Sequence, residues 1–232
     1  TKVARKLIDD GRLGRVYHAR STGHRRRGRP FVDGYGTDNF VKKEIASGGA
    51  LFDMGIYHIA QMLYLLGLPE VERVSGKTYQ ETGMDAARRE SSGYNVEELG
   101  MGLVRCGGNV TFDIIEAWAI LLDPFEGSFI VGSEGGIRMD PFGFHTTVSD
   151  VEMDGTFLLG QADTRWHRLN ENEDGYDSPQ KHWIAALQDR VPLLPTAELA
   201  LKTMLISEGI YLSNELGREV TAKEIEEASV SK

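Results

Sequence analysis

Short strand-like segments follow one another through the middle of this 232-residue chain, with no helical pattern between them. They are rich in Val, Ile, Phe and Thr, the residues that favour extended backbone. The segments that we expect are Val71–Gln80, Val96–Val104, Val110–Leu121, Ser128–Val131, Ile137–Asp140, Thr146–Glu152 and Thr156–Gly160. Hairpin turns are expected at Gly107-Gly108-Asn109, at Gly135-Gly136 and at Gly155. Closely spaced strands without intervening helices predict a mostly antiparallel sheet.

Helical patterns flank this run of strands on both sides. Before it, residues 3–8 place apolar side chains on one face of a helix, and Gly14–Ser21 alternates as a first strand. The other helices that we expect cover residues 51–66, 178–188, 195–216 and 221–228. Thr221 and Glu224 have the spacing of a capping box at the start of the last helix. This order is typical of an α+β domain with an open, mostly antiparallel sheet and helices on one face.

Charge and cysteine content exclude several classes of protein. The chain carries 35 acidic against 26 basic residues, a net charge of −9, which argues against binding to nucleic acid or to an anionic membrane. No apolar run approaches the roughly 20 residues that span a bilayer. Cys106 is the only cysteine, so a disulfide scaffold is excluded and a reducing cytoplasm is the expected compartment. The six histidines lack ligand spacing, and we expect no metal.

The segment 51–66 is apolar around most of its circumference, yet one polar stripe runs along it. Asp53, Tyr57 and Gln61 lie at i, i+4 and i+8, on one face of an α-helix. The stripe is either an internal hydrogen-bonding ladder or the polar wall of a catalytic cleft, and the residue types alone leave both open. His58 follows Tyr57 at about 100° around the helix. We therefore expect His58 to project off the stripe and its loss to matter least.

A short basic run, His24–Arg29, stands out in this acidic chain. It is either a solvated loop or a contact to a cofactor phosphate or a substrate carboxylate, because arginine forks suit both anions. Arg26 is our candidate for that contact. Asp33 follows closely and no stacking platform is evident, so the run does not predict nucleic-acid binding.

Several segments together resemble one protein family. Residues 48–57, Gly-Gly-Ala-Leu-Phe-Asp-Met-Gly-Ile-Tyr, resemble the GGxxxDxGxH/Y signature of the Gfo/Idh/MocA oxidoreductases. Further resemblances occur in order along the whole chain, at Ile8–Gly14, Val96–Glu98, Val131–Ile137 and Glu208–Ser213.

The resemblance implies an NAD- or NADP-dependent oxidoreductase of a sugar, a cyclitol or a related polyol. In this family an N-terminal Rossmann domain binds the dinucleotide, and a C-terminal α+β domain binds substrate on one side of its sheet and often forms a homodimer through the other. The acid/base group is a His or Tyr four residues after the signature Asp, which implies that Tyr57 and Asp53 are catalytic. His58 and Gln61 are then substrate-site candidates, and Asp38 lies where the family sometimes places a ligand of a substrate hydroxyl.

The sequence departs from the family pattern in two places. It has no strand–GxGxxG–helix unit, so residues 1–232 are expected to form the single substrate and dimerisation domain, with the Rossmann domain upstream and no cofactor-binding residue in this chain. A helix that is already running at Thr1 agrees with a missing upstream segment. Many members also carry an Asp seven residues after the signature Asp, whereas this chain has Ala60, with Gln61 beside it.

The missing half matters for the chemistry of a tyrosine base. A tyrosine with an ordinary pKa near 10 needs a neighbouring cation to act as a base near pH 7. The family's "EKP" lysine would supply that cation but belongs to the missing half, and an anion such as Asp53 opposes a phenolate. We therefore expect Asp53 to orient Tyr57 or to pair with that lysine. The alternative is a stand-alone, non-catalytic domain that binds polyols or forms dimers.

Overall fold

The computed structural model describes residues 1–123, 127–169 and 178–229, and its centre is one nine-stranded sheet. The strands are β1 (Val16–His24), β2 (Val71–Tyr79), β3 (Leu99–Cys106), β4 (Val110–Ala117), β5 (Phe129–Gly132), β6 (Gly135–Met139), β7 (Phe142–Val148), β8 (Val151–Thr156) and β9 (Val220–Thr221). They lie in the order β8-β7-β6-β5-β1-β4-β3-β2-β9. β1 and β4 run parallel, and the other neighbouring pairs in this order are antiparallel.

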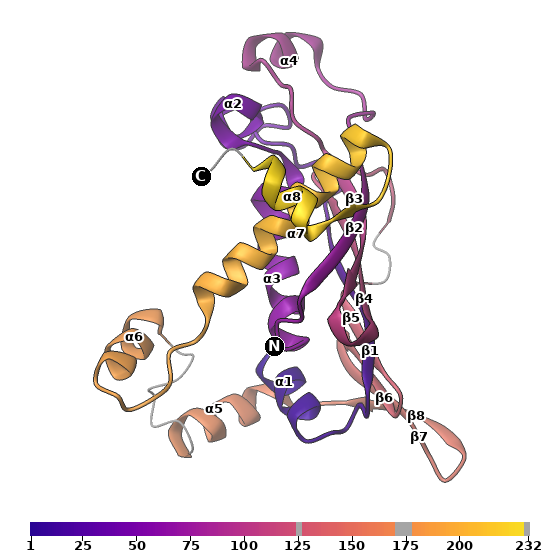
Figure 1. Ribbon diagram of the computed structural model, residues 1–232, viewed down its shortest axis with the longest axis vertical. Helices are drawn as coiled ribbons and strands as arrows, with labels where there is room; N and C mark the ends of the chain where they lie inside the picture. The colour runs from indigo at the N-terminus through magenta and orange to yellow at the C-terminus, as the bar shows by residue number, and fades with distance from the viewer. Residues whose placement is uncertain (124–126, 170–177, 230–232) are drawn as a thin grey trace.

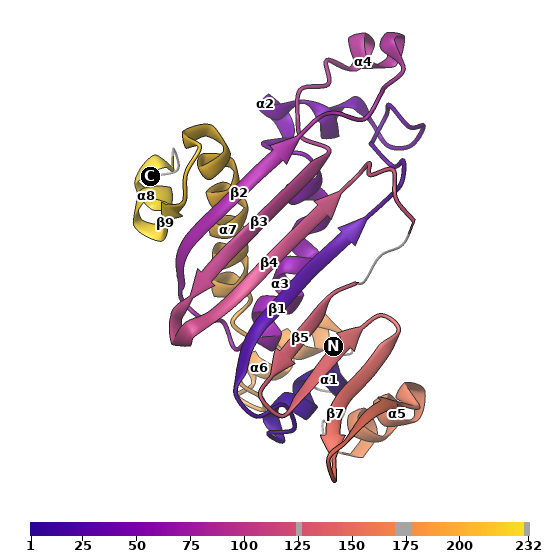
Figure 2. The ribbon, with the colours of Figure 1, turned by 90° about the vertical axis from the view of Figure 1, so that its right-hand side faces the viewer.

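Helices cover one face of this sheet. The helices of the described chain are α1 (Lys2–Asp9), α2 (Lys43–Ala46), α3 (Ile56–Leu65), α4 (Ala86–Ser92), α5 (Leu159–Leu169), α6 (Pro179–Leu187), α7 (Thr196–Leu216) and α8 (Ala222–Ala228). Short helical turns are η1 (Asp38–Val41), η2 (Leu51–Gly55) and η3 (Gly107–Asn109). Figure 1 shows the sheet edge-on with α3, α7 and α8 on one side, and Figure 2 shows the other face, over which no helix of the described chain lies. The predicted fold class is confirmed.

The main apolar core lies between the sheet and the helices α3 and α7. A Cβ atom on Gly76 of β2 or on Gly102 of β3 would lie 2.8 Å from the side chain of Ile210. These two glycines therefore let α7 pack directly onto the strands. Fully buried members of the core are Leu13, Leu51, Ile59, Met62, Leu63, Phe112, Ile130, Ile206 and Ile210.

Most of the expected elements are present, and the errors have local causes. The strand expected at Thr156–Gly160 is wrong, because β8 ends at Thr156 and α5 begins at Leu159. Gly135, Gly136 and Gly155 lie inside strands rather than in turns. The tight turn between β7 and β8 is instead formed by Ser149 and Asp150, which both have positive φ, as the favoured two-residue hairpin turn requires.

Among the helical features that the sequence did not predict are the capped helix α4 and a π-helical turn. Asp85 caps α4 by accepting a hydrogen bond from the backbone N–H of Arg88, and Gly93 ends the helix in the left-handed conformation. The segment expected as one α-helix begins as the π-helical turn η2 and becomes α-helical only from Ile56. Such turns are rare and are often found at functional sites.

Candidate functional site

A hollow of about 440 Å³ opens where the end of β1 meets η2 and the first turn of α3. Its lining comes from both segments and is rich in polar side chains: Gly23, His24, Arg25, Asp53, Met54, Tyr57 and His58. The phenol of Tyr57 is the most open of the catalytic candidates, since 71% of this residue is exposed. We take this hollow as the candidate site.

A buried carboxylate fixes the start of η2. Glu97 accepts hydrogen bonds from the backbone N–H groups of Gly49 (2.8 Å) and Leu51 (3.0 Å). A Cβ atom on Gly49 would lie 2.0 Å from the carbonyl oxygen of Glu97, so only glycine permits this close approach. Burial raises the pKa of Glu97, although these backbone hydrogen bonds oppose the shift. The paired glycines therefore anchor the segment that carries Asp53.

The π-helical turn changes which side chains share a face. In an α-helix residues i and i+5 diverge, whereas a π-helical turn closes i→i+5 hydrogen bonds and brings such residues closer to one line. Asp53 and His58 are five residues apart, and both line the hollow together with Tyr57. The expectation that His58 projects away from Asp53 and Tyr57 is therefore wrong.

Strand β4 and the residue just beyond its end supply the hydrogen-bond partners of Asp53 and His58, which line the hollow together with Tyr57. The indole Nε1 of Trp118, just beyond the end of the strand, donates a hydrogen bond to Oδ2 of Asp53 at 2.8 Å. Two residues earlier, both carboxylate oxygens of Glu116 lie within hydrogen-bonding distance of His58 Nδ1, at 2.9 and 3.1 Å. Trp118 and Glu116 are themselves fully buried. Buried residues at the end of β4 therefore fix the side chains of Asp53 and His58 in the site.

Both members of the His58–Glu116 pair have a pKa above the ordinary value of their group. The hydrogen bond to Glu116 raises the pKa of His58, against an opposing effect of burial. Burial raises the pKa of Glu116, although His58 opposes this shift. Ser21 of β1 also donates a hydrogen bond to Glu116 Oε1 at 3.2 Å.

Gln61 lies in a second hollow, of about 640 Å³, on the other side of Tyr57. Its side-chain amide donates a hydrogen bond to Thr1 Oγ1 at 2.5 Å. Ala60 and Trp166 line the same hollow, and Tyr57 lines both. The predicted stripe is therefore split, with Asp53 on one side, Gln61 on the other and the phenol between them.

Asp38 and Arg26 do not line either hollow. Lys42 donates a hydrogen bond to Asp38 Oδ2 at 2.5 Å within the segment of η1 and α2. Arg26 pairs with Asp123 and donates a hydrogen bond to the carbonyl oxygen of Leu122 at 3.3 Å. The structure does not bring these two candidates to Tyr57.

The basic run divides into residues with different roles. Arg29 is fully buried and pairs with Asp33 (2.8 Å) and Glu98 (2.9 Å), which is a structural network. Arg25 lines the hollow, where its guanidinium donates a hydrogen bond to the phenolic oxygen of Tyr35 at 2.5 Å. Arg25 therefore places a fixed cation beside the candidate site.

The sequence indicated His24 and Arg25 only as members of the basic run, and it gave no role to Glu116 and Trp118, which support the site. A signal for Glu116 was present in the sequence, because it occupies the same face of its strand as Phe112 and Ile114. A carboxylate in such an apolar row needs a buried partner. Nothing in the local sequence indicates that the partner is His58.

The described residues do not fit the phosphate end of a dinucleotide. Gly132–Gly136 spans the connection from β5 to β6, a hairpin rather than the strand–turn–helix that cradles a pyrophosphate. Within the described ranges, no three His, Cys, Asp or Glu side chains come together as a metal site. In those same ranges no helix has both the length and the apolar character needed to cross a bilayer.

Comparison with known proteins gives consistent matches. A family model described as the GFO/IDH/MocA C-terminal domain matches residues 1–138. The chain is 23% identical over 227 residues to a D-glucoside 3-dehydrogenase of Escherichia coli (strain K12), covering 95% of this chain and 60% of that protein. A levoglucosan dehydrogenase solved with NADH and L-sorbose has a TM-score of 0.67 and 17% identity, over 94% of this chain and 61% of that one. An Agrobacterium radiobacter oxidoreductase solved with NAD+, L-tartaric acid and magnesium has a TM-score of 0.64 and 18% identity, over 97% and 62%.

The chain spans about three fifths of the length of these relatives. At such low identity the two solved structures show a shared fold. The family model covers more than half of the chain, and its matched residues include η2, α3 and β4. The chain therefore belongs to the GFO/IDH/MocA family, and the match is to the C-terminal domain of that family.

Proposed function

We propose that this chain is the substrate-binding domain of an NAD- or NADP-dependent oxidoreductase that acts on a sugar, a cyclitol or a related polyol. Tyr57 exchanges the proton of the reacting hydroxyl in this proposal. Family membership supports it, as do the relatives described as a D-glucoside 3-dehydrogenase and as a levoglucosan dehydrogenase with bound NADH. The cofactor is held mainly by a Rossmann domain outside residues 1–232, because the described residues lack a pyrophosphate cradle.

The observation that carries the proposal is that the exposed phenol of Tyr57 shares one hollow with two fixed polar groups, Asp53 and His58. Trp118 holds Asp53 by a hydrogen bond, and Glu116 holds His58. The side chains of Asp53, Tyr57 and His58 line one hollow. Fixed groups of this kind orient a substrate hydroxyl at little further cost in entropy.

Several residues that line the two hollows beside Tyr57 have a proposed role. Tyr57 takes the proton from the hydroxyl, and Arg25 lines the same hollow as a cation that a bound substrate can contact. Asp53 binds a neighbouring hydroxyl, His58 lines the same hollow, and Gln61 borders the substrate from the second hollow. Arg26 and Asp38 take no part, because their side chains pair with other residues outside both hollows. The nicotinamide, when bound, supplies the hydride acceptor.

The test is Tyr57→Phe in the natural protein that carries this chain. Loss of a general acid or base lowers turnover by about 10²–10⁴-fold, whereas the fold is retained because only an exposed hydroxyl is removed. Turnover is followed as NADH or NADPH absorbance with D-glucosides and a panel of polyols. Tyr17→Phe is the matched control, since Tyr17 is another exposed tyrosine and lies on β1 outside both hollows.

Equal turnover in Tyr57→Phe and Tyr17→Phe contradicts the role of Tyr57. Binding of a polyol without any oxidation, with either cofactor present, favours the non-catalytic alternative.

A further inference from the structure

Burial of the carboxylate of Glu116 on β4 is energetically unfavourable. Glu116 is fully buried and follows Phe112 and Ile114 on the face of the strand that packs against the helices. A carboxylate at such a position loses its hydration, and this loss costs free energy unless hydrogen-bond partners compensate. Its partners are the imidazole of His58 and the hydroxyl of Ser21. An apolar side chain would fill the same place in the core without these requirements, which indicates a role beyond packing.

The ring of His58 is fixed on two sides. Nδ1 is held by Glu116, and the ring lies against the backbone of β1 at Gly23. A Cβ atom on Gly23 would approach ring atoms Cε1 and Nδ1 to within 2.2 and 2.3 Å, so no other residue fits without moving the ring. Nε2, on the opposite edge of the ring, has no hydrogen-bond partner within the described part of the chain, and 36% of the side chain is exposed. His58 therefore has one buried nitrogen and one available nitrogen.

Charged and titratable groups approach His58 from each element that surrounds it. Glu116 lies on β4, His24 on β1, and Asp53 and Tyr57 on the same helical segment as His58. Arg25 follows β1, and its charge opposes protonation of His58. The hydrogen bond to Glu116 is the larger effect and raises the pKa of His58.

We propose that His58, positioned by Glu116, carries the reacting proton between Tyr57 and solvent. This inference rests on the proposed function and extends it. During oxidation the nicotinamide, when bound, would accept the hydride of the substrate C–H bond. The O–H proton passes to the phenolate oxygen of Tyr57, which leaves a C=O bond. The phenol then gives that proton across the hollow to Nε2 of His58, and the imidazolium releases it to water. In the reducing direction the same proton travels the opposite way. Glu116 is a positioning residue throughout.

This relay has a defined dependence on pH. Nε2 accepts a proton only while the imidazole of His58 is neutral, so substrate oxidation rises with pH as His58 loses its own proton. Because Glu116 raises the pKa of His58, it places this rise at a higher pH. Removal of the negative charge of Glu116 shifts the rise to lower pH. A purely structural role of Glu116 lowers turnover at every pH and leaves the shape of the profile unchanged.

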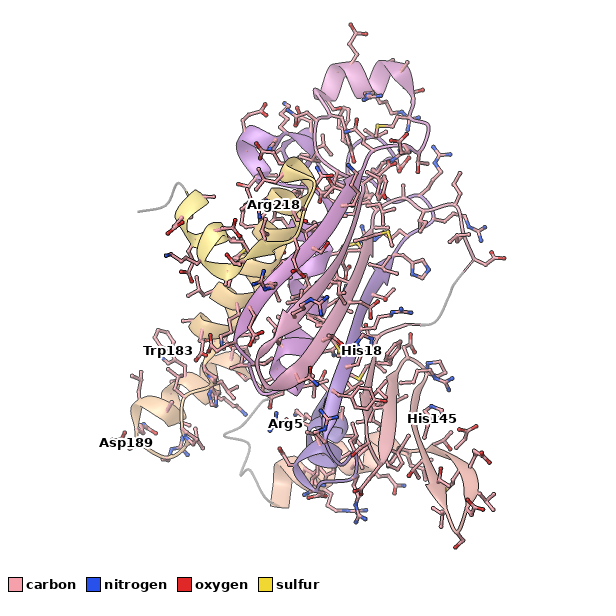
Figure 3. The ribbon with its side chains drawn as sticks, turned by 45° about the vertical axis from the view of Figure 1, so that its right-hand side comes forward. Arg5, His18, His145, Trp183, Asp189 and Arg218 are labelled. Atoms are coloured by element: carbon pink, nitrogen blue, oxygen red, sulfur yellow. The ribbon has the colours of Figure 1, made fainter. Side chains whose placement is uncertain are left out.

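The first experiment compares Glu116→Gln with the wild type in the natural protein. The titration midpoint of His58 is read from the Cε1–Hε1 signal in NMR, assigned by its loss in His58→Gln, and the pH dependence of kcat is measured in parallel. We expect both midpoints to move to lower pH in Glu116→Gln. The matched control is Asp154→Asn, which removes the carboxylate from the exposed His145–Asp154 pair (2.6 Å) on β7 and β8, where Figure 3 labels His145. It should leave both midpoints of the site unchanged.

A second variant keeps the inference testable if Glu116→Gln fails to fold. In His58→Ala the carrier is absent, and we expect kcat to fall roughly 10²-fold, at the lower end of losses for proton-transfer groups. Imidazole added to the buffer should restore part of that loss, increasingly as its neutral form increases, and should not accelerate Asp154→Asn.

An unchanged His58 midpoint in folded Glu116→Gln overturns the role of Glu116. Absence of imidazole rescue in His58→Ala overturns the relay, even where Tyr57→Phe loses activity as proposed. A protein with a raised His58 midpoint that oxidises no polyol overturns the proposed function, and the relay falls with it.

Discussion

Gly23 shows at the scale of one residue how a missing side chain organises the site. It lies at the end of β1, where the ring of His58 and the carboxylate of Glu116 occupy the space that a Cβ atom would need. The sequence alone gives no reason to single out this glycine from the others of the chain. Only the packing of β1 against α3 shows that its lack of a side chain is required.

We therefore predict that Gly23→Ala displaces His58. The added methyl group would meet the ring at 2.2 Å and Glu116 Oε2 at 2.6 Å. A displacement of about 1 Å at a reacting group lowers turnover by roughly 10²-fold, and the crowding costs about 1–3 kcal/mol of unfolding free energy. Turnover and urea unfolding measure the two effects. The control is Gly83→Ala, which has open space around the added atom; equal behaviour of both variants contradicts the assignment.

At the scale of the element, η2 and the glycine pair before it position the side chains of the site. Glu97 satisfies the backbone N–H groups of Gly49 and Leu51, which a helix start otherwise leaves unpaired. The pKa of Glu97 is raised above its ordinary value of 4.5, mainly by burial. The folded state thus prefers the protonated carboxyl, and the contribution of Glu97 to stability decreases as the pH rises through its folded pKa.

We predict that Glu97→Gln destabilises the protein more at pH 5 than at pH 8. The amide keeps one acceptor oxygen and leaves one of the two backbone N–H groups without its bond, at a cost of about 1–3 kcal/mol. The wild type loses part of its advantage at higher pH because its buried carboxyl ionises, whereas the amide does not titrate. Urea unfolding of both proteins at the two pH values measures the difference. A gap that widens with pH contradicts the sign of the pKa shift.

At the scale of the whole molecule, the sheet has one face covered by helices and one open face. A row across the open face runs through Arg20, Asp113, Leu103 and Ser75 in the strand pairing. Arg20 pairs with Asp113 at 2.7 Å, and His18, which Figure 3 labels, lies 3.1 Å from the same carboxylate. Exposed Tyr79, Met101 and Leu103 add apolar surface beside this polar cluster.

We propose that this open face forms a homodimer interface, since an open sheet with apolar side chains is a natural surface for self-association. Leu103→Lys should then convert a dimer to a monomer, because it places a charge in the apolar part of a surface that the dimer would bury. Light scattering at micromolar concentration measures the mass. Val151→Lys, at an exposed position on β8, should leave the mass unchanged. A monomeric wild type, or a dimer that survives Leu103→Lys, contradicts the proposal.

The sequence alone determined the features that depend on local patterns. The strand-like segment Val71–Gln80 predicted β2, which spans Val71–Tyr79. The spacing of Thr221 and Glu224 predicted the capping box of α8, and the closely spaced strands predicted a mostly antiparallel sheet. The signature at residues 48–57 indicated the family. These features require only neighbouring residues, whose periodicity and hydrogen-bonding groups are visible in order along the chain.

Tertiary structure decided which polar groups meet. The parallel pairing of β1 with β4 brings Ser21 and Gly23 beside Glu116, about 95 residues away in sequence. The π-helical turn η2 then directs His58 into the same hollow as Asp53, against the α-helical spacing expected for this segment. Periodicity carries no information on such pairings, because they arise from the packing of a helix on a distant strand and from the hydrogen bonds that a buried carboxylate requires.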